Sequence, residues 1–417
     1  MNSKYVDVII IGSGIAGLYS AYKIKQIFSK TSFLVLEKYK KHWIGGRTNN
    51  DEFYSTQIVT GAGIGREDTN PLLIHLLKEL NIPFKKTTSI MDYAKTIPRP
   101  INVIKVIQLL RKEYKKNKEE FRKLNFKQFA TKILGEKLYK EFIVSTGYSD
   151  YEGADIYETL YNYGFDDTVG GWPMLFIPWK KLVSKLVSEI GSKNIKFSQD
   201  VIKIERKNEI PCLFNITTEQ GSSYSCNKVI LATTITSIQK LLPQYSNIYN
   251  QIHGQTFLRL YGKFDKASAH ILNQVIKNYT IVPGPLQKII PMNSEKGIYM
   301  IAYSDNENAK ELKPYLENNS KNREYLCRLI ERTLGLSINS LYLIAIKEYY
   351  WPVGTHYYEP LKDFKTREEF VQKAQHPMAN ILVVGEVVTR YQGWVEGALE
   401  SVESGLTKKW IGHNTCL

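Results

Sequence analysis

The sequence has only four cysteines, Cys212, Cys226, Cys327 and Cys416, and no two of them form a CxxC pair. Structural zinc sites and thioredoxin-like dithiols need closely spaced cysteines, so we expect neither, and no metal. Few, scattered thiols also suit a reducing compartment, because structural disulfides accumulate in oxidising ones. The cysteine content therefore favours a cytoplasmic protein without a metal centre.

Long apolar runs are absent as well. No stretch approaches the roughly 18 consecutive apolar residues of a membrane-spanning helix, so we expect no membrane span. The apolar run at residues 6–11 is too short for a signal peptide and leads directly into Gly-Ser-Gly. It is better explained as a buried strand. Internal repeats and low-complexity linkers are also missing.

Acidic residues are outnumbered, with 41 Asp and Glu against 56 Lys and Arg, which gives a formal net charge of +15. Part of the excess lies in residues 111–123, RKEYKKNKEEFRK. This run is either a surface for nucleic acid or anionic membrane, or a solvated helix face. Glu113, Glu119 and Glu120 interrupt it, which favours the solvated face. No zinc-finger or RRM motif accompanies it, so a nucleic-acid partner is not favoured.

The length of 417 residues, 43% of them hydrophobic, exceeds what one compact core usually holds, so we expect two domains. Short apolar runs typical of buried parallel strands occur at 5–11, 33–36, 229–232 and 381–384. Because these runs are spread over the whole chain, we expect an α/β fold with one sheet built from discontinuous segments. The second domain, α+β with a helical lobe, would be inserted between them.

Helical spacing and alternation predict the other elements. A small antiparallel meander is expected from runs at 195–197, 201–204, 213–217 and 224–226. The helical lobe is expected over the lysine-rich residues 100–143. Further helices are expected at 15–28, 71–80, 178–190, 306–334 and 396–410.

A glycine-rich turn, GSGIAG, joins the first strand to the first helix. In such a fingerprint Gly12 makes the tight turn, Gly14 lets a pyrophosphate approach the backbone, and Gly17 lets helix and strand pack closely. The first helical turn, with Ile15 and Ala16, supplies free N–H groups and partial positive charge for phosphate. This pattern predicts a dinucleotide site.

Glu37 ends the second predicted strand, where its carboxylate can accept hydrogen bonds from both ribose hydroxyls of an adenosine. An acidic residue there disfavours a 2′-phosphate, so NADP is not expected. A glycine motif alone is weak evidence, but here the strand, the helix, the second strand and the terminal acid are all in place. The residues themselves thus indicate an ADP-containing cofactor.

A second glycine segment, Gly45, Gly46, Arg47 and Thr48, follows the acidic strand end. This GGRT segment resembles the flavin amine oxidase superfamily, which includes monoamine and polyamine oxidases and L-amino-acid oxidases. In that frame the glycines pass close to the cofactor, and Arg47 offers a charge near the pyrophosphate or the ribityl chain. Taken alone, the segment also fits a surface turn with a solvated arginine.

The resemblance continues to the C-terminus. Val201 resembles the family valine that meets the adenine, and residues 227–233 resemble the strand that follows. Residues 385–405 resemble the flavin motif, which implies that the last helix points its N-terminus at the flavin pyrimidine. The resemblance therefore implies FAD. The residues expected to bind it are Gly12, Gly14, Ile15, Ala16, Gly17, Glu37, Gly45, Gly46, Arg47, Thr48, Val201, Gly385, Glu386, Gly393, Trp394, Val395 and Ala398.

The family chemistry implied is hydride transfer from a C–H beside nitrogen to flavin N5, with O2 as acceptor and hydrogen peroxide as product. The partners expected are thus a small amine and O2. Two aromatic rings often flank the amine in this family. Trp394 lies at one such position, and Tyr357 is expected at the other, followed by Trp351. Each could instead be an aromatic residue of a domain interface.

Three positions depart from the family pattern. Arg259 stands where many members carry a lysine that holds a water at N5, and arginine cannot serve as a tunable base. Arg259 could bind a substrate carboxylate or be a surface arginine, and Lys263 is close by. His356 stands where some members link a cysteine to the flavin, but a hydrogen-bonded structural histidine is favoured, so FAD is expected to be non-covalent. Thr60 replaces a frequent acidic residue.

Three functions stay open. Amine oxidation with FAD and O2 is preferred, and the net charge weighs only weakly against polyamines, because a global charge need not describe one pocket. A desaturase or isomerase of the same fold is the alternative that Arg259 suggests. A structural or nucleic-acid-associated protein retaining the fold is the third. The FAD-binding domain is expected to comprise residues 1–80, 178–254 and 371–417, and the substrate domain residues 81–177 and 255–370.

Overall fold

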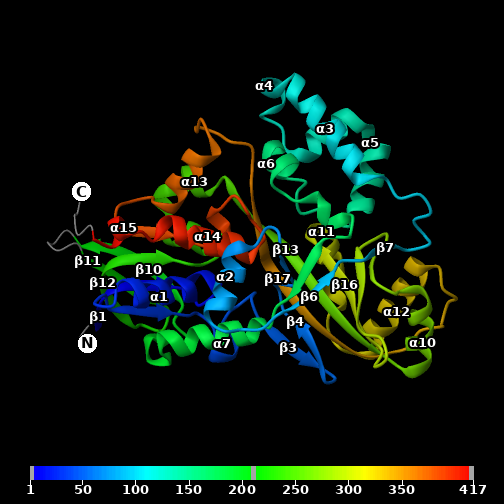
Figure 1. Cartoon of the computed structure of the whole chain (residues 1–417), viewed down its shortest axis with the longest axis horizontal. Helices are drawn as coiled ribbons and strands as arrows, with labels where there is room; N and C mark the ends of the chain where they lie inside the picture. Colours follow the sequence, from blue (N-terminus) through cyan, green and yellow to red (C-terminus); the bar gives the residue numbers. More distant parts are fainter. Residues whose placement is uncertain (1–3, 208–212, 413–417) are drawn as a thin grey trace.

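A computed structural model describes residues 4–207 and 213–412, which form two large sheets and a helical lobe (Figure 1). Cys212 and Cys416 lie outside the described residues. The first sheet has seven strands in the order β10-β11-β12-β1-β2-β9, with β18 also paired to β12. Its strands are β1 (Lys4–Ile11), β2 (Phe33–Leu36), β9 (Ile195–Lys196), β10 (Val201–Lys207), β11 (Leu213–Thr218), β12 (Ser223–Leu231) and β18 (Ile381–Val383).

The first sheet is buried on both faces because its strands are apolar at successive positions. In β1, Val8 and Ile10 enter one hydrophobic core, whereas Ile9 and Ile11 enter the core on the opposite face. Side chains alternate along a strand, so a continuous apolar run requires cover on both sides. One face is covered by α1 (Ile15–Ile27), α7 (Trp179–Ile190) and α14 (Val395–Gly405), and the other by α8 (Ile235–Leu241) and α13 (Arg367–Gln375).

The second sheet has six strands in the order β17-β13-β16-β15-β14-β7. Its two longest strands pair antiparallel from Ile252 opposite Tyr358 to Phe264 opposite Leu343, and they run from the first sheet to the far end of the molecule (Figure 1). The strands are β7 (Met91–Tyr93), β13 (Ile252–Phe264), β14 (Tyr279–Ile281), β15 (Lys288–Asn293), β16 (Ile298–Asp305) and β17 (Leu343–Tyr358). One face is covered by α10 (Lys266–Val275), α11 (Asn306–Leu312) and α12 (Ser320–Leu334).

The helical lobe has its own aromatic core, which includes Phe126, Phe129 and Phe142. It consists of α3 (Val103–Lys116), α4 (Lys118–Phe121), α5 (Phe126–Thr146) and α6 (Ile156–Tyr161). The basic run of residues 111–123 lies here on exposed helices, where Lys116 pairs with Glu113 and Arg122 with Glu119. Among the described helices, none has the length and apolar character needed to cross a bilayer.

Most of the expected elements are confirmed, including the four buried strands and the helical lobe. The helix expected at 306–334 is instead divided into α11 and α12, with a 3-10 turn at Lys313–Tyr315 between them. The meander was wrong in two respects. Residues 195–196 do not join it, because β9 pairs parallel with β2 at the sheet edge. The runs at 224–226 and 229–232 are one strand, β12, whose first half pairs with β11 and second half with β18. The meander is thus an extension of the first sheet.

The last predicted helix, 396–410, is also corrected. It divides into α14 and α15 (Lys408–Gly412), because the chain leaves the helix at Leu406. Thr407 begins the second helix: its hydroxyl accepts a hydrogen bond from Trp410 N, and its carbonyl accepts one from Ile411 N.

The strands of the first sheet all come from residues 1–80, 178–254 and 371–417. Those of the second sheet come from 81–177 and 255–370, except that β13 begins three residues earlier, at Ile252. We therefore keep these ranges as the proposed domains.

Candidate active site

The three glycines in the turn after β1 have two different roles: two of them allow close backbone packing, and one leaves open space. Gly12 has a φ of +103°, and a Cβ there would lie 2.5 Å from Ala232 O. A Cβ on Gly17 would lie 2.0 Å from Gly12 O, so this glycine lets α1 pack on the turn. A Cβ on Gly14, in contrast, would meet nothing within 4 Å. The turn therefore presents an open face at Gly14 alone.

The N-terminus of α1 points into this open space. Its N-cap, Gly14, supplies no side chain, and the first turn contains no acidic residue. The N–H groups of the first turn, which includes Ile15 and Ala16, have no partners within the helix, and the helix dipole adds partial positive charge. This combination fits a phosphate group.

The GGRT segment lies directly against the glycine turn. Gly14 and Gly45 form a parallel bridge, and Gly45 N donates to Ser13 O at 3.0 Å. Gly46 has a φ of +54°, and a Cβ on it would also meet nothing within 4 Å. Thr48 N closes the second turn by donating to Gly45 O at 2.9 Å. Two open glycine positions thus share one cradle.

Glu37 holds this cradle to the end of β2. Its Oε2 accepts hydrogen bonds from Ser13 N at 2.8 Å and Ser13 Oγ at 2.6 Å, and its Oε1 accepts one from Tyr39 N at 2.9 Å. Gln199 N donates to Glu37 O at 2.8 Å, which brings the start of β10, with Val201, to the same strand end. Sequence reasoning missed Ser13, because a variable position in a glycine motif carries no signal of its own.

The C-terminal motif is tied to the GGRT segment by a buried ionic network. Glu386 Oε1 accepts from Arg47 Nη1 at 2.8 Å and from His356 Nδ1 at 2.5 Å, while Oε2 accepts from Gly393 N at 3.0 Å. Burial by itself raises the pKa of Glu386, but His356 and Arg47 outweigh it and hold the pKa well below its usual range. Arg47 also donates to Gly354 O at 2.6 Å. Three distant chain segments therefore meet at one carboxylate.

His356 is fixed by both of its ring nitrogens. Nε2 accepts a hydrogen bond from Ile235 N at 3.1 Å, so the ring proton lies on Nδ1 and is donated to Glu386. The side chain is buried in the interior. This arrangement is that of a structural histidine.

The start of α14 is held by its own second residue. The Glu396 carboxylate accepts hydrogen bonds from Leu72 N at 2.9 Å and Leu73 N at 3.0 Å, in the first turn of α2 (Pro71–Glu79). Trp394 is the N-cap of α14 and makes no side-chain cap, so the first turn after it, with Val395, has its N–H groups available. Ala398 is buried at the following turn.

The two expected aromatic residues lie in different surroundings. The Trp394 ring is 5.4 Å from the guanidinium of Arg66, which also lies 4.5 Å from the Trp172 ring. Tyr357 instead packs 5.1 Å from the His253 ring and against Gly153. No ring contact joins Trp394 to Tyr357 within the described residues. Sequence reasoning did not anticipate Arg66, whose buried position only the fold reveals.

Arg259 and Trp351 hold the segment that contains Thr60. Arg259 Nε donates to Gly61 O at 2.6 Å, and its guanidinium lies 4.2 Å from the Tyr303 ring. Trp351 Nε1 donates to Thr60 O at 2.7 Å. Lys263 is committed elsewhere, since its Nζ donates to Lys296 O on the exposed side. Arg259 thus fixes the loop that follows β4 (Thr56–Val59) against β13.

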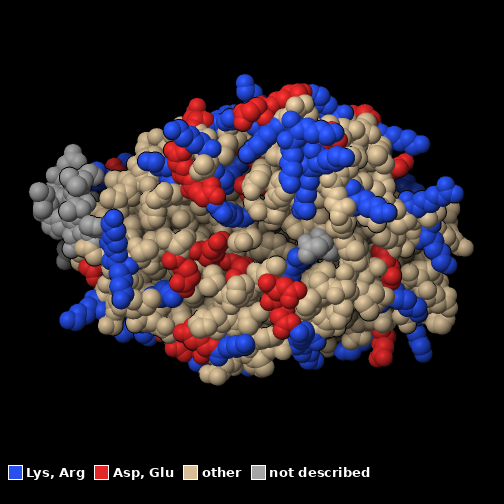
Figure 2. Space-filling view, turned by 45° about the horizontal axis from the view of Figure 1, so that its top comes forward, with Lys and Arg blue, Asp and Glu red and all other residues tan. Residues whose placement is uncertain are grey.

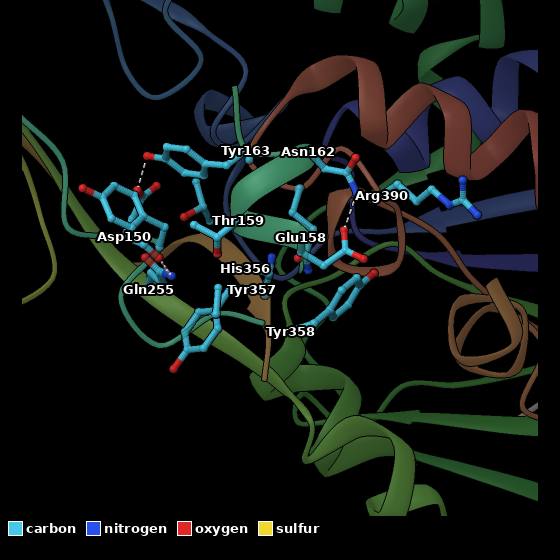
Figure 3. A pocket seen from close by; sticks show the side chains of 15 residues that line it. Asp150, Glu158, Thr159, Asn162, Tyr163, Gln255, His356, Tyr357, Tyr358 and Arg390 are labelled. Carbon is cyan, nitrogen blue, oxygen red and sulfur yellow. Dashed lines mark hydrogen bonds between the residues drawn. The ribbon is translucent and has the colours of Figure 1, made fainter. Parts of the chain in front are cut away.

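A cavity lies between the helical lobe and β17 (Figure 3). Its lining includes Thr355, His356 and Gly393, which adjoin the ionic network. Asp150 of the lobe lies at one end beside Gln255, whereas Glu158 of the lobe lies toward Tyr358, and Tyr357 forms part of the wall (Figure 3). Sequence reasoning missed the two lobe carboxylates because no motif covers this part of the chain. Across residues 4–207 and 213–412, no cluster of His, Cys, Asp and Glu is arranged to hold a metal ion.

Comparison with known proteins gives a consistent picture. A family described as flavin containing amine oxidoreductase matches residues 105–403. No curated protein matches the chain. Cyclohexylamine oxidase from Brevibacterium oxydans IH-35A is similar in structure, with a TM-score of 0.74 at 14% identity over 96% of this chain and 97% of that one.

A putrescine oxidase triple mutant, from a structure-based redesign of cofactor binding, is similar as well. Its TM-score is 0.72 at 13% identity, over 96% of this chain and 98% of that one. At such low identity the likeness shows the fold alone, and it confirms the predicted α/β fold class.

Proposed function

The chain belongs to the flavin-containing amine oxidoreductases, as its resemblance predicted, and from this premise we propose that it oxidises a C–N bond of an amine with FAD and O2. One observation carries the proposal. Gly14 and Gly46 leave a cradle open beside the N-terminus of α1. Apart from the adjacent residues, no described protein atom lies within 4 Å of the place that a Cβ on either glycine would occupy. That space matches the needs of a dinucleotide pyrophosphate.

The residues present fit FAD from end to end. The pyrophosphate would lie on Gly12, Gly14, Ile15, Ala16 and Gly17, with Gly45, Gly46 and Thr48 on its other side. Glu37 would face the adenosine ribose, and Val201 the adenine. The ribityl chain would pass the Arg47–Glu386 pair beside Gly385. The flavin ring would meet Gly393, Trp394, Val395 and Ala398.

FAD supplies the hydride acceptor when bound, and the protein's own task is to hold the parts in place. The Arg47–Glu386–His356 network fixes the backbone at Gly393, and the α14 N-terminus offers partial positive charge to the reduced ring. We propose that Trp394 and Tyr357 border the substrate on separate walls. For Arg259 we propose a positioning role, since its Nε is held by Gly61 O.

We propose that FAD is bound without a covalent link. Both nitrogens of His356 are engaged by the chain, so neither is available to bond the flavin. Of the cysteines that the structure describes, Cys226 and Cys327 are both buried in hydrophobic cores away from the cradle.

The test is an absorbance spectrum of the purified protein, followed by anaerobic addition of a panel of amines. We expect a flavin spectrum that bleaches with at least one amine, recovers in air and yields peroxide. A flavin that no amine reduces would contradict amine oxidation and favour the desaturase or isomerase that Arg259 suggests. A colourless protein that FAD does not reconstitute would favour a protein retaining only the fold.

A further inference from the structure

The cavity between the helical lobe and β17 contains three buried polar atoms that have no hydrogen-bond partner among the described residues: Gln255 Oε1, Thr355 Oγ1 and Gln392 Nε2. Buried polar atoms in proteins nearly always find partners. Three such atoms around one cavity indicate that a polar ligand supplies the missing hydrogen bonds.

The orientation of Gln255 shows what kind of group the cavity accepts at the end where Asp150 lies. Its Nε2 donates to the main-chain oxygen of Asp150, so the atom turned away from that contact is the acceptor Oε1. The side chain is buried, with 4% of its surface exposed. The carboxylate of Asp150 lines the same end (Figure 3). Two acceptors from different elements therefore call for a ligand that donates hydrogen bonds.

The charges around the cavity select a cation. Glu158 is neutralised by Arg367, at 3.2 Å, and Arg390 is paired with Glu368. Asp150 makes no ion pair within the described residues, and its carboxylate accepts a hydrogen bond from the uncharged Tyr163 hydroxyl. The cavity therefore has an acidic end that is not yet compensated by an ion pair.

Two further charged groups lie near Asp150 without neutralising it directly. Burial, and then the neighbouring Asp305, raises the pKa of Asp150. Lys288 acts in the opposite sense, but its Nζ lies over the Tyr148 ring and has no hydrogen-bond partner in the described part of the chain. Burial and Asp305 thus outweigh Lys288, and a positively charged ligand beside Asp150 would stabilise its ionised carboxylate.

We propose that Asp150 and Gln255 bind a second ammonium group, so that the preferred substrates are amines with two nitrogens. The inference rests on the proposed function. A substrate whose reacting C–N bond lies near Thr355 and Gly393 would extend along the cavity toward these two residues.

The net charge of +15 does not oppose this specificity, because the field inside a pocket is set by its own lining. In Figure 2, Asp and Glu side chains gather beside the central hollow of this face, whereas Lys and Arg crowd the surface above it.

The experiment compares α,ω-diaminoalkanes with n-alkylamines of equal length on the FAD-loaded enzyme. We expect kcat/KM to be higher for the diamine at the best chain length. Asp150→Asn should raise KM for that diamine about tenfold or more and leave kcat/KM for the alkylamine within about twofold. Gln255→Leu should also raise KM for the diamine, and this variant tests the subsite if Asp150→Asn does not fold.

Glu152→Gln is the matched control. Glu152 lies on the same loop, also accepts a hydrogen bond from a tyrosine, Tyr139, and does not line the cavity, so its diamine kinetics should stay at the wild-type values. Equal kcat/KM for diamines and alkylamines in the wild type would overturn the inference while leaving amine oxidation intact. A flavin that no amine bleaches would instead overturn the proposed function itself.

Discussion

Replacing Gly14 by alanine separates the cofactor role of the glycine turn from its structural role. The backbone at Gly14 has φ −66° and ψ 178°, which alanine adopts without strain, and the added methyl group meets nothing within 4 Å. Alanine is a poorer N-cap than glycine, but it also lowers the entropy of the unfolded chain, which favours the folded state. The two effects oppose each other, so the stability of the flavin-free protein should change by no more than about 0.5 kcal/mol.

The affinity for FAD should respond differently. The methyl group occupies the space in which a pyrophosphate would approach the N–H groups of Ile15 and Ala16. Losing one or two charge-assisted hydrogen bonds, at about 1.5–3 kcal/mol each, predicts a 10- to 100-fold or larger increase in Kd. The assay is FAD titration of the flavin-free protein, with Kd measured by flavin fluorescence and stability by thermal unfolding.

Gly17→Ala is the matched control. Its methyl group would lie 2.0 Å from Gly12 O, so helix and turn must separate. This overpacking should cost about 1–3 kcal/mol and lower the melting temperature of the flavin-free protein itself. If Gly14→Ala binds FAD as tightly as the wild type, the cradle does not hold the pyrophosphate and the reasoning is refuted.

Three further predictions concern the surroundings of the site. Glu386→Gln should destabilise the fold at neutral pH by about 3–5 kcal/mol, since it strips Arg47 and His356 of their buried partner. Because the folded pKa of Glu386 lies below its ordinary value, this stabilisation is present above about pH 4.3 and is lost as pH falls. The melting temperatures of wild type and variant should therefore converge in acid. A difference in melting temperature that stays constant with pH would contradict the network. Lys288→Met should raise the free energy of unfolding at neutral pH by about 1 kcal/mol, because burial lowers the pKa of an amine that has no hydrogen-bond partner among the described residues. This gain, measured by chemical denaturation, should shrink toward about pH 10, where the lysine of the unfolded chain is neutral too. A destabilised variant would show that the folded protein compensates the amine. Denaturation in guanidinium should release all flavin into the filtrate, whereas yellow colour retained on the protein would disprove non-covalent binding.

The parts of the fold that could be predicted are those with a strong local pattern. β1, α1 and β2 follow from an apolar run, a glycine turn and helical spacing, all within one short stretch. The pairing of β9 could not be predicted, because residues 195–196 would show the same alternation of apolar and polar residues whether their partner strand is parallel or antiparallel. The break of α14 at Leu406 was missed for a similar reason: apolar periodicity continues through the break, and only the Thr407 cap marks it.

Within the candidate site, the glycines and acids belong to motifs, but their partners do not. Arg47 and Glu386 were predicted as separate cofactor contacts. In the structure Arg47 lies 2.8 Å from Glu386, and His356, from a third segment of the chain, binds the same carboxylate oxygen. Such a contact leaves no trace in the spacing of either residue. Asp150 and Gln255 are a stronger example, since each is unremarkable in its own segment and becomes informative only where lobe and sheet meet.

The three glycines of the turn differ in what they say about function, although the motif treats them alike. Gly12 and Gly17 are required by the fold itself, because a Cβ on either would collide with backbone atoms. Their presence would be explained even if the protein bound nothing. Gly14 has no such reason: its backbone suits any residue, and serine, threonine, aspartate or asparagine would cap α1 at least as well. The absence of a side chain where the protein leaves room for one is explained by a ligand that needs the space, and this makes Gly14 the most informative residue of the cradle.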